Sequence, residues 1–152
     1  MVRPLALRGD AIFSYTVADT TDGGTATAGP DQIRPINTVD RNEIGASLSV
    51  NEITLLAGTY WAEWSCQWFA TFTTQTWLET DGGTELAVGQ RNYSTDSQAD
   101  GITTVGSGLF TFASSDVIRI GYRVGRSGTM GVSNQPMGRN AKFAEIKFWK
   151  VS

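Results

Sequence analysis

Two glutamates stand within strand-like segments that are rich in tryptophan, and they are the first candidates for chemistry. A pair of carboxylates on either side of a bound sugar is the machinery of glycoside hydrolysis. Glu63 and Glu79 are the acids that such a reaction would use here. Glu63, however, shares its face of the alternating segment with Ser65 and Gln67, which favours a solvated or interface position. We therefore predict no catalytic pair.

The composition removes several other chemistries. The chain contains no histidine, so a Ser-His-Asp or Cys-His catalytic group and a histidine-ligated metal are impossible. Its one cysteine cannot form an internal disulfide. Cys66 falls on an aromatic face of alternating residues, which is typical of a small core residue rather than a reactive thiol. We expect a protein that is not an enzyme and that needs no cofactor.

Acidic pairs in two loop-like segments offer oxygen ligands to calcium. Asp19 and Asp22 form one pair, and Asp96 and Asp100 form the other. Neither pair has the glycine spacing and terminal glutamate of an EF-hand loop, so we interpret them as turn-capping residues and predict no metal site. The alternative left open is a calcium ion bound in a loop or between subunits. The Arg-Gly-Asp tripeptide at residues 8–10 resembles an adhesion motif, but three residues match often by chance, and we interpret them as the start of a strand.

The charge balance bears on partners. Twelve basic and fifteen acidic residues give a formal charge of −3, which argues against a nucleic-acid binder. Arg119, Arg123 and Arg126 form a local basic stripe that we interpret as ion-pair contacts with other subunits rather than as a phosphate site. The start of the chain has no apolar run typical of a signal peptide. No segment is long and apolar enough to predict a membrane span.

The elements that must position these residues are strands. The 152 residues fit one domain, and the 17 glycines, 5 tryptophans and 7 phenylalanines suit pleated strands joined by tight turns. Residues 60–72 and 117–124 alternate strictly, which indicates half-buried strands with one apolar face each. On the first, the apolar face runs from Tyr60 through Trp64 to Phe72. The fold class is therefore predicted to be all-β.

The C-terminal run, residues 141–151, is apolar on both faces. Phe143 and Trp149 lie on its odd face, and Ile146 and Phe148 lie on its even face. Because the core can cover only one side, a second subunit is the natural cover for the other. Three tryptophans are predicted at the surface, where subunit packing competes with sugar stacking and is the favoured role: Trp61, Trp77 and Trp149.

Six segments together resemble a known family: residues 34–38, 45–49, 52–60, 108–112, 116–120 and 145–150. The first three, which end in Gly58-Thr59-Tyr60, resemble the start of a complement-type globular head. Their order, with the final aromatic strand, is similar to the tumour necrosis factor-like jelly roll used in phage fibre heads and capsid decoration proteins. The resemblance covers about residues 32–152.

This resemblance implies a two-sheet antiparallel jelly-roll sandwich that assembles as a homotrimer about its C-terminal strands. We expect residues 1–31 to form an N-terminal arm with a first strand at residues 11–17 and a flexible loop, and residues 32–152 to form the head. The residues expected at the trimer interface are Tyr60, Trp64, Phe143, Ile146, Phe148 and Trp149.

The function expected from this resemblance is that of a non-enzymatic phage virion protein, a trimeric capsid decoration or cement protein on the particle surface. It would be assembled in the host cytoplasm, and its partner would be the major capsid protein. Four arm residues are expected to anchor it: Arg3, Leu5, Leu7 and Arg8. The alternative is the receptor-binding head of a tail or head fibre, joined to a fibre shaft and recognising a host cell-surface glycan through apical loops.

Overall fold

The computed structural model describes residues 9–94, 101–133 and 136–152, and these form strands and turns without a helix. No helix that could span a membrane occurs in this part of the chain. The strands are β1 (Asp10–Val17), β2 (Thr25–Ala26), β3 (Gln32–Ile33), β4 (Thr38–Asn42), β5 (Ser47–Ser49), β6 (Glu52–Leu55), β7 (Gly58–Phe69), β8 (Thr73–Thr80), β9 (Glu85–Val88), β10 (Asn92–Tyr93), β11 (Gly101–Phe112), β12 (Asp116–Val124), β13 (Gly128–Thr129) and β14 (Ala141–Lys150). The prediction of an all-β chain is confirmed.

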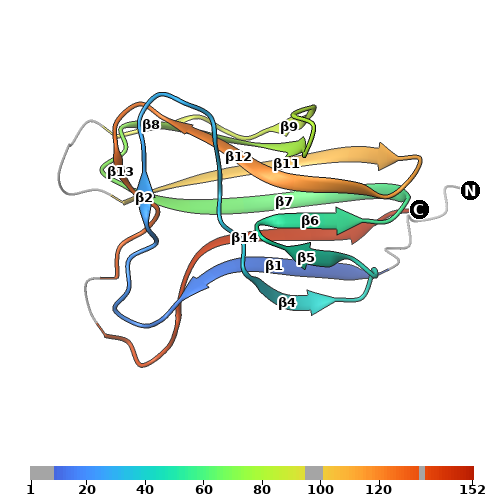
Figure 1. Cartoon of the computed structure of the whole chain (residues 1–152), viewed down its shortest axis with the longest axis horizontal. Coiled ribbons are helices and arrows are strands. Elements are labelled where there is room, and N and C mark those ends of the chain that lie inside the picture. The colour runs from blue at the N-terminus through green and yellow to red at the C-terminus, as the bar shows by residue number, and fades with distance from the viewer. Residues whose placement is uncertain (1–8, 95–100, 134–135) are drawn as a thin grey trace, which may run out of the picture.

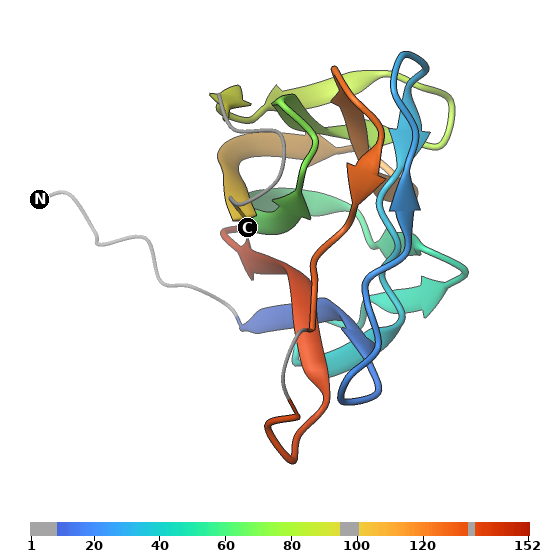
Figure 2. The same ribbon diagram turned by 90° about the vertical axis from the view of Figure 1, so that its left-hand side faces the viewer.

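The described strands form two antiparallel seven-stranded sheets that pack face to face (Figures 1 and 2). The first sheet has the order β2–β13–β7–β14–β1–β4, and β11 pairs with β7 along its whole length. The second has the order β10–β8–β12–β6–β5, with β3 on β12 and β9 on β8. Strands that are distant in sequence are neighbours in both sheets, so the sandwich is closed by long-range pairing.

Alternation places the core as the sequence predicts for β7 and β12. The even residues of β7 are buried from Tyr60 to Trp68, and the even residues of β12 are buried from Ile118 to Val124. The predicted apolar face of β7 extends too far, because Ala70 and Phe72 do not continue it. Both have a positive φ, at 59° and 58°, and the chain turns there after Phe69.

A fully buried arginine lies within the core. The guanidinium of Arg34 lies 4.6 Å from the ring centroid of Trp68 and 5.6 Å from that of Tyr15. Its Nη2 donates hydrogen bonds to the carbonyl oxygens of Met130 and Phe143, both at 2.9 Å. Through these two bonds Arg34 joins the segment after β12 to the last strand. Its cation–π and charge-assisted contacts are strong because water is excluded from them.

The first strand lies inside its sheet. β1 pairs with β14 from Asp10 opposite Trp149 to Val17 opposite Ala141, and its other side pairs with β4. Figure 1 shows β1 between these two strands. The first strand expected at residues 11–17 is therefore part of the sandwich, where it lies beside the last strand and is paired on both sides.

The expected flexible loop after β1 is also part of the sandwich. Its β2 pairs with β13 (Figure 2), and Ala26 is fully buried. The backbone of Gly23 donates to Gly131 at 3.0 Å, and that of Met130 donates to Gly24 at 2.8 Å. These bonds fix the path of a segment that its small polar composition alone would leave free, so the boundary predicted at residue 31 does not divide the fold.

Burial of Cys66 makes a pH-dependent contribution to stability. Burial raises the pKa of this thiol from 9.0 to about 11, and the positive charge of Arg34 partly opposes the rise. The unfolded chain releases this proton first, so the thiol's contribution is intact below pH 9 and is lost as the pH rises toward 11. The loss reaches about 3 kcal/mol of unfolding free energy.

We expect urea denaturation of the wild type between pH 8 and 11 to show this loss. Cys66→Ala is the matched variant, because Tyr60 and Tyr122, whose pKa values burial also raises, stay in both proteins. The stability of the wild type should fall more steeply with pH than that of Cys66→Ala. Parallel curves would contradict the assignment.

Candidate subunit interface

Three neighbouring strands of the first sheet present an ordered grid of side chains on their outer face. Cross-strand pairing aligns Trp149 of β14, Trp61 of β7 and Leu109 of β11 in one apolar row. Trp61 is 37% exposed and Leu109 is 61% exposed, while Trp149 is half-buried. We call these three residues the apolar row. Exposed apolar side chains that form one patch mark interaction sites more often than isolated ones do, so the apolar row is a candidate interaction site.

Below the apolar row the same strands carry polar side chains around a depression. The next row pairs Lys147, Glu63 and Ser107, and the one after it pairs Glu145, Ser65 and Val105. These six residues line most of a depression of about 430 Å³. Its floor includes Trp64, whose indole lies against Gly106, where a Cβ would come within 2.1 Å of the ring. A glycine at 106 is therefore required for the tryptophan beneath the surface.

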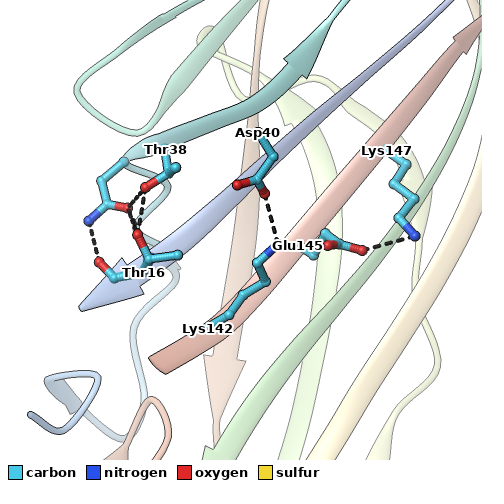
Figure 3. A network of polar contacts seen from close by, with 7 residues as sticks. Thr16, Thr38, Asp40, Lys142, Glu145 and Lys147 are labelled. Carbon is cyan, nitrogen blue, oxygen red and sulfur yellow. Dashed lines mark hydrogen bonds and ion pairs between the residues drawn. The ribbon is translucent and has the colours of Figure 1, made fainter. Parts of the chain in front are cut away.

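The other half of this outer face, over β4, β1 and β14, is closed by a polar network (Figure 3). Lys142 bridges Asp40 at 2.8 Å and Glu145 at 3.1 Å, and Lys147 contacts Glu145 at 3.0 Å. Beside them, the hydroxyls of Thr16 and Thr38 are 2.6 Å apart. Charges in this half are satisfied within one chain, so the apolar row on β14, β7 and β11 is the more available contact surface.

The pKa values of the network follow from these contacts. Partial burial is the largest influence on the pKa of Asp40 and raises it, but the hydrogen bonds from Lys142 and Ser14 and the positive charge of Lys142 together outweigh burial, so the pKa lies below its usual value. Burial and the bonds from Lys147 and Lys142 act in the same opposed way on Glu145, whose pKa is also lowered. The hydrogen bond to Asp40 raises the pKa of Lys142. All three groups are charged at neutral pH, which keeps this half of the face hydrophilic.

No family model and no curated protein matches the sequence. Solved structures do match over nearly the whole chain. The Eiger TNF of S. frugiperda is 14% identical, with a TM-score of 0.64, and covers 94% of this chain and 92% of its own. The globular domain of zebrafish complement 1qA is 14% identical, with a TM-score of 0.57, over 95% and 98%. Murine APRIL at pH 8.5 is 15% identical, with a TM-score of 0.53, over 93% and 99%.

This chain has a tumour necrosis factor-like jelly-roll fold. The finding confirms the resemblance inferred from the six sequence segments and the two-sheet antiparallel sandwich expected from it.

Within this TNF-like fold, most of the residues expected at a trimer interface are core residues of a single chain. Tyr60, Ile146 and Phe148 are fully buried, and Trp64 is almost so. Phe148 meets the rings of Phe13 and Phe110 edge to face, with centroids 6.2 and 6.5 Å away. Side chains covered by their own sandwich have no surface for a partner, so the interface role expected for these four is wrong. Trp149, at the surface, keeps that role as a candidate.

Phe143 was expected beside Trp149 on the outer face, and a bulge redirects it. The register between β1 and β14 shifts so that Tyr15 faces Ala144 and Thr16 faces Lys142, which leaves Phe143 as the extra residue. Its ring packs against Gly131, where a Cβ would lie 2.3 Å away. The second apolar face of the last strand is thus covered at this end by the chain's own loops, and not by another subunit.

The two glutamates proposed for sugar chemistry lie on different sheets. Glu63 is on β7 and accepts a hydrogen bond from Nε1 of Trp61 at 3.0 Å. Glu79 is on β8 and accepts from Nε1 of Trp77 at 2.6 Å and from Nε of Arg119 at 2.8 Å. Since both point away from the core that separates the sheets, they cannot act on one glycosidic bond. Trp77 is likewise separated from Trp61 and Trp149.

The acids proposed as calcium ligands bind backbone instead. Asp19 accepts from the backbone nitrogens of Met137 and Gly138, the latter at 2.6 Å, and the bond from Met137 is the main cause of its lowered pKa. Asp22 accepts from Ser133 at 2.9 Å. Among the described residues no cluster of three or more metal-ligating side chains occurs. Asp19 also accepts from the backbone nitrogen of Thr20 at 3.1 Å, which fits the turn-capping interpretation, whereas Asp22 instead joins the segment after β1 to Ser133.

The basic stripe is mostly paired inside the chain. Arg119 bonds Glu79 and Arg123 bonds Asp31 at 2.7 Å. Arg126 lies over the ring of Phe72, 5.0 Å from its centroid. The expected anchoring residues Arg3, Leu5, Leu7 and Arg8 and the pair Asp96 and Asp100 lie outside the described residues.

Two residues on the outer face of the first sheet were not predicted from the sequence. Leu109 and Val105 are both exposed, at 61% and 42%, on the outer face of β11. The signal was present, because Phe110 and Phe112 alternate with Leu109 and take the core face. The sequence did not predict that β11 pairs with β7 so that Leu109 lies opposite Trp61.

Proposed function

We propose that this chain is the non-catalytic, homotrimeric head of a phage virion-surface protein, and that it decorates or cements the capsid. The observation that carries the assembly step is the apolar row of Trp149, Trp61 and Leu109 on the outer face of the first sheet. The TNF-like fold places this row on the C-terminal strand and its neighbours, the strands about which the resemblance implies a trimer.

The chemistry of the face supports copies of the same chain as its cover. The apolar row is bordered by Lys147 and Glu63, so the face carries both signs of charge beside its apolar centre. Such a surface is self-complementary, with polar groups around an apolar core, as subunit interfaces commonly are. Packing three copies would bury Trp61 and Leu109, which one chain leaves exposed.

In the proposed role the trimer binds the major capsid protein at the particle surface and stabilises the shell by mass action. Residues 1–8, with Arg3 and Arg8 as cations and Leu5 and Leu7 as apolar anchors, are proposed to reach the shell. The described part of the fold supports this division of labour, because its first strand, β1, begins at Asp10, after the proposed anchoring residues.

Co-sedimentation with capsids stripped of surface proteins tests the proposal. The full chain should bind in many copies per particle, and a chain lacking residues 1–8 should keep its assembly and melting temperature but lose the capsids. Absence of binding by the full chain would reject the decoration role. Full binding by the shortened chain would reject the anchoring residues and favour the alternative, a fibre head that recognises a host glycan. Trp77 on the second sheet supports that alternative, because it lies on the outer face, where an aromatic ring can contact a sugar.

A further inference from the structure

Trp77 occupies a surface that the candidate interface leaves open. It lies on β8, on the outer face of the second sheet, directly opposite Gly121 of β12 and Val88 of β9. A Cβ at Gly121 would come within 2.2 Å of Nε1 and 2.4 Å of Cε2 of the indole. The ring therefore lies across the neighbouring strand in space that only a glycine leaves free.

Hydrogen bonds fix the orientation of this ring. Nε1 of Trp77 donates to Oε2 of Glu79 at 2.6 Å, and the other carboxylate oxygen of Glu79 accepts from Nε of Arg119 at 2.8 Å. The indole N–H is thus already used, and what the ring offers a ligand is apolar surface. A side chain held in one orientation before binding loses little entropy when a ligand arrives.

The ring lies in a depression of about 360 Å³ with polar walls, a size within the usual range for small-ligand sites, roughly 300–1,000 Å³. On one wall, the guanidinium of Arg91 bonds Oε1 of Gln75 at 3.1 and 3.3 Å. On another, Arg123 bonds Asp31 at 2.7 Å. The remaining donors and acceptors of these paired groups are available around the apolar ring.

The charges of these walls select the ligand class. Asp31, Glu79 and Glu85 offset Arg91 and Arg123, with Arg119 held behind Glu79. A phosphate would require an excess of positive charge, and a divalent cation would require clustered acids, of which the described residues have no group of three. A balanced wall around a flat apolar ring instead matches an uncharged molecule with one apolar face and many hydroxyls.

We propose that the depression over Trp77 binds a neutral glycan. The indole packs against the C–H face of a pyranose ring, and the guanidinium, amide and carboxylate groups of Arg91, Gln75, Asp31 and Arg123 bond its hydroxyls. The site is on a sheet face and not in the apical loops. It uses no residue of the apolar row or of residues 1–8, so the glycan site can be tested independently of the proposed decoration role.

An array of neutral, sialylated and phosphorylated oligosaccharides, probed with the full chain, tests the ligand class. The neutral oligosaccharide that gives the strongest signal is then titrated as a free, monovalent ligand by calorimetry. Trp77→Ala should weaken binding by about tenfold or more, as loss of an aromatic stacking partner does for nucleic-acid bases. Trp77→Phe, which keeps an apolar ring, should retain part of the affinity.

Two further variants keep the test decisive. Arg91→Ala changes a wall residue that is exposed, and it should weaken binding while leaving the melting temperature unchanged. Leu56→Ala removes an exposed apolar side chain outside the depression and should bind like the wild type. The proposal is overturned if no neutral oligosaccharide binds at millimolar concentration, if anionic glycans are preferred, or if the folded Trp77 and Arg91 variants bind like the wild type.

Discussion

Replacing Phe148 by alanine is expected to lower the free energy of unfolding by about 4 kcal/mol. Its ring is fully buried and packs edge to face on Phe13 and Phe110. Removing it loses the transfer energy of the ring and leaves a cavity between the sheets. The measurement is equilibrium denaturation, in which the midpoint should shift with little change of slope.

The neighbouring residue supplies the control. Trp149→Ala deletes a side chain of the same strand that faces outward and is half-buried, so it should cost only about 1 kcal/mol in the isolated chain. Both variants are best measured in a Trp61→Glu background, which removes assembly from the comparison. Equal losses for Phe148 and Trp149 would contradict the assignment of the two residues to core and surface.

The second large effect is expected on assembly. Trp61→Glu should convert a trimer, of three times the 16.4 kDa chain mass, into monomers in light scattering. The new carboxylate would lie between Trp149 and Leu109 and near Glu63, and burying it there without a partner is unfavourable by several kcal/mol. Because Trp61 is outside the core, the monomer should remain folded.

Trp77→Ala is the matched control for assembly, since this tryptophan lies on the second sheet, away from the apolar row. It should keep the wild-type mass. A wild-type protein that stays monomeric at micromolar concentration would overturn the trimer, and a trimeric Trp61→Glu variant would move the interface to another face. The two tryptophan variants therefore separate assembly from glycan binding: Trp61→Glu removes the first, and Trp77→Ala removes the second.

The local pattern of apolar and polar residues was sufficient to predict the main strands and to predict which face of each strand is buried. Side chains alternate with a period of two along any extended chain, so the burial of Trp64 and Ile118 and the exposure of Glu63 and Arg123 follow from their positions in the sequence. The separation of apolar clusters by turn residues likewise predicted an all-β chain. The segments resembling a TNF-like jelly roll gave the architecture that the solved structures confirm.

Only the tertiary structure decided which strands became neighbours and what covered each face. The sequence predicted a partner subunit over Phe143 because a bulge in β14 cannot be recognised from the alternation of residues along one strand. The bulge is defined by the register of β14 against β1. Trp61 and Trp77 are similar in sequence context, yet one pairs with Trp149 and Leu109 and the other with Gly121. The sequence by itself determines which residues can line a strand's two faces, since that depends on adjacent residues. Interfaces and sites depend on pairings between distant residues, and those are selected by the packing energy of the whole sandwich.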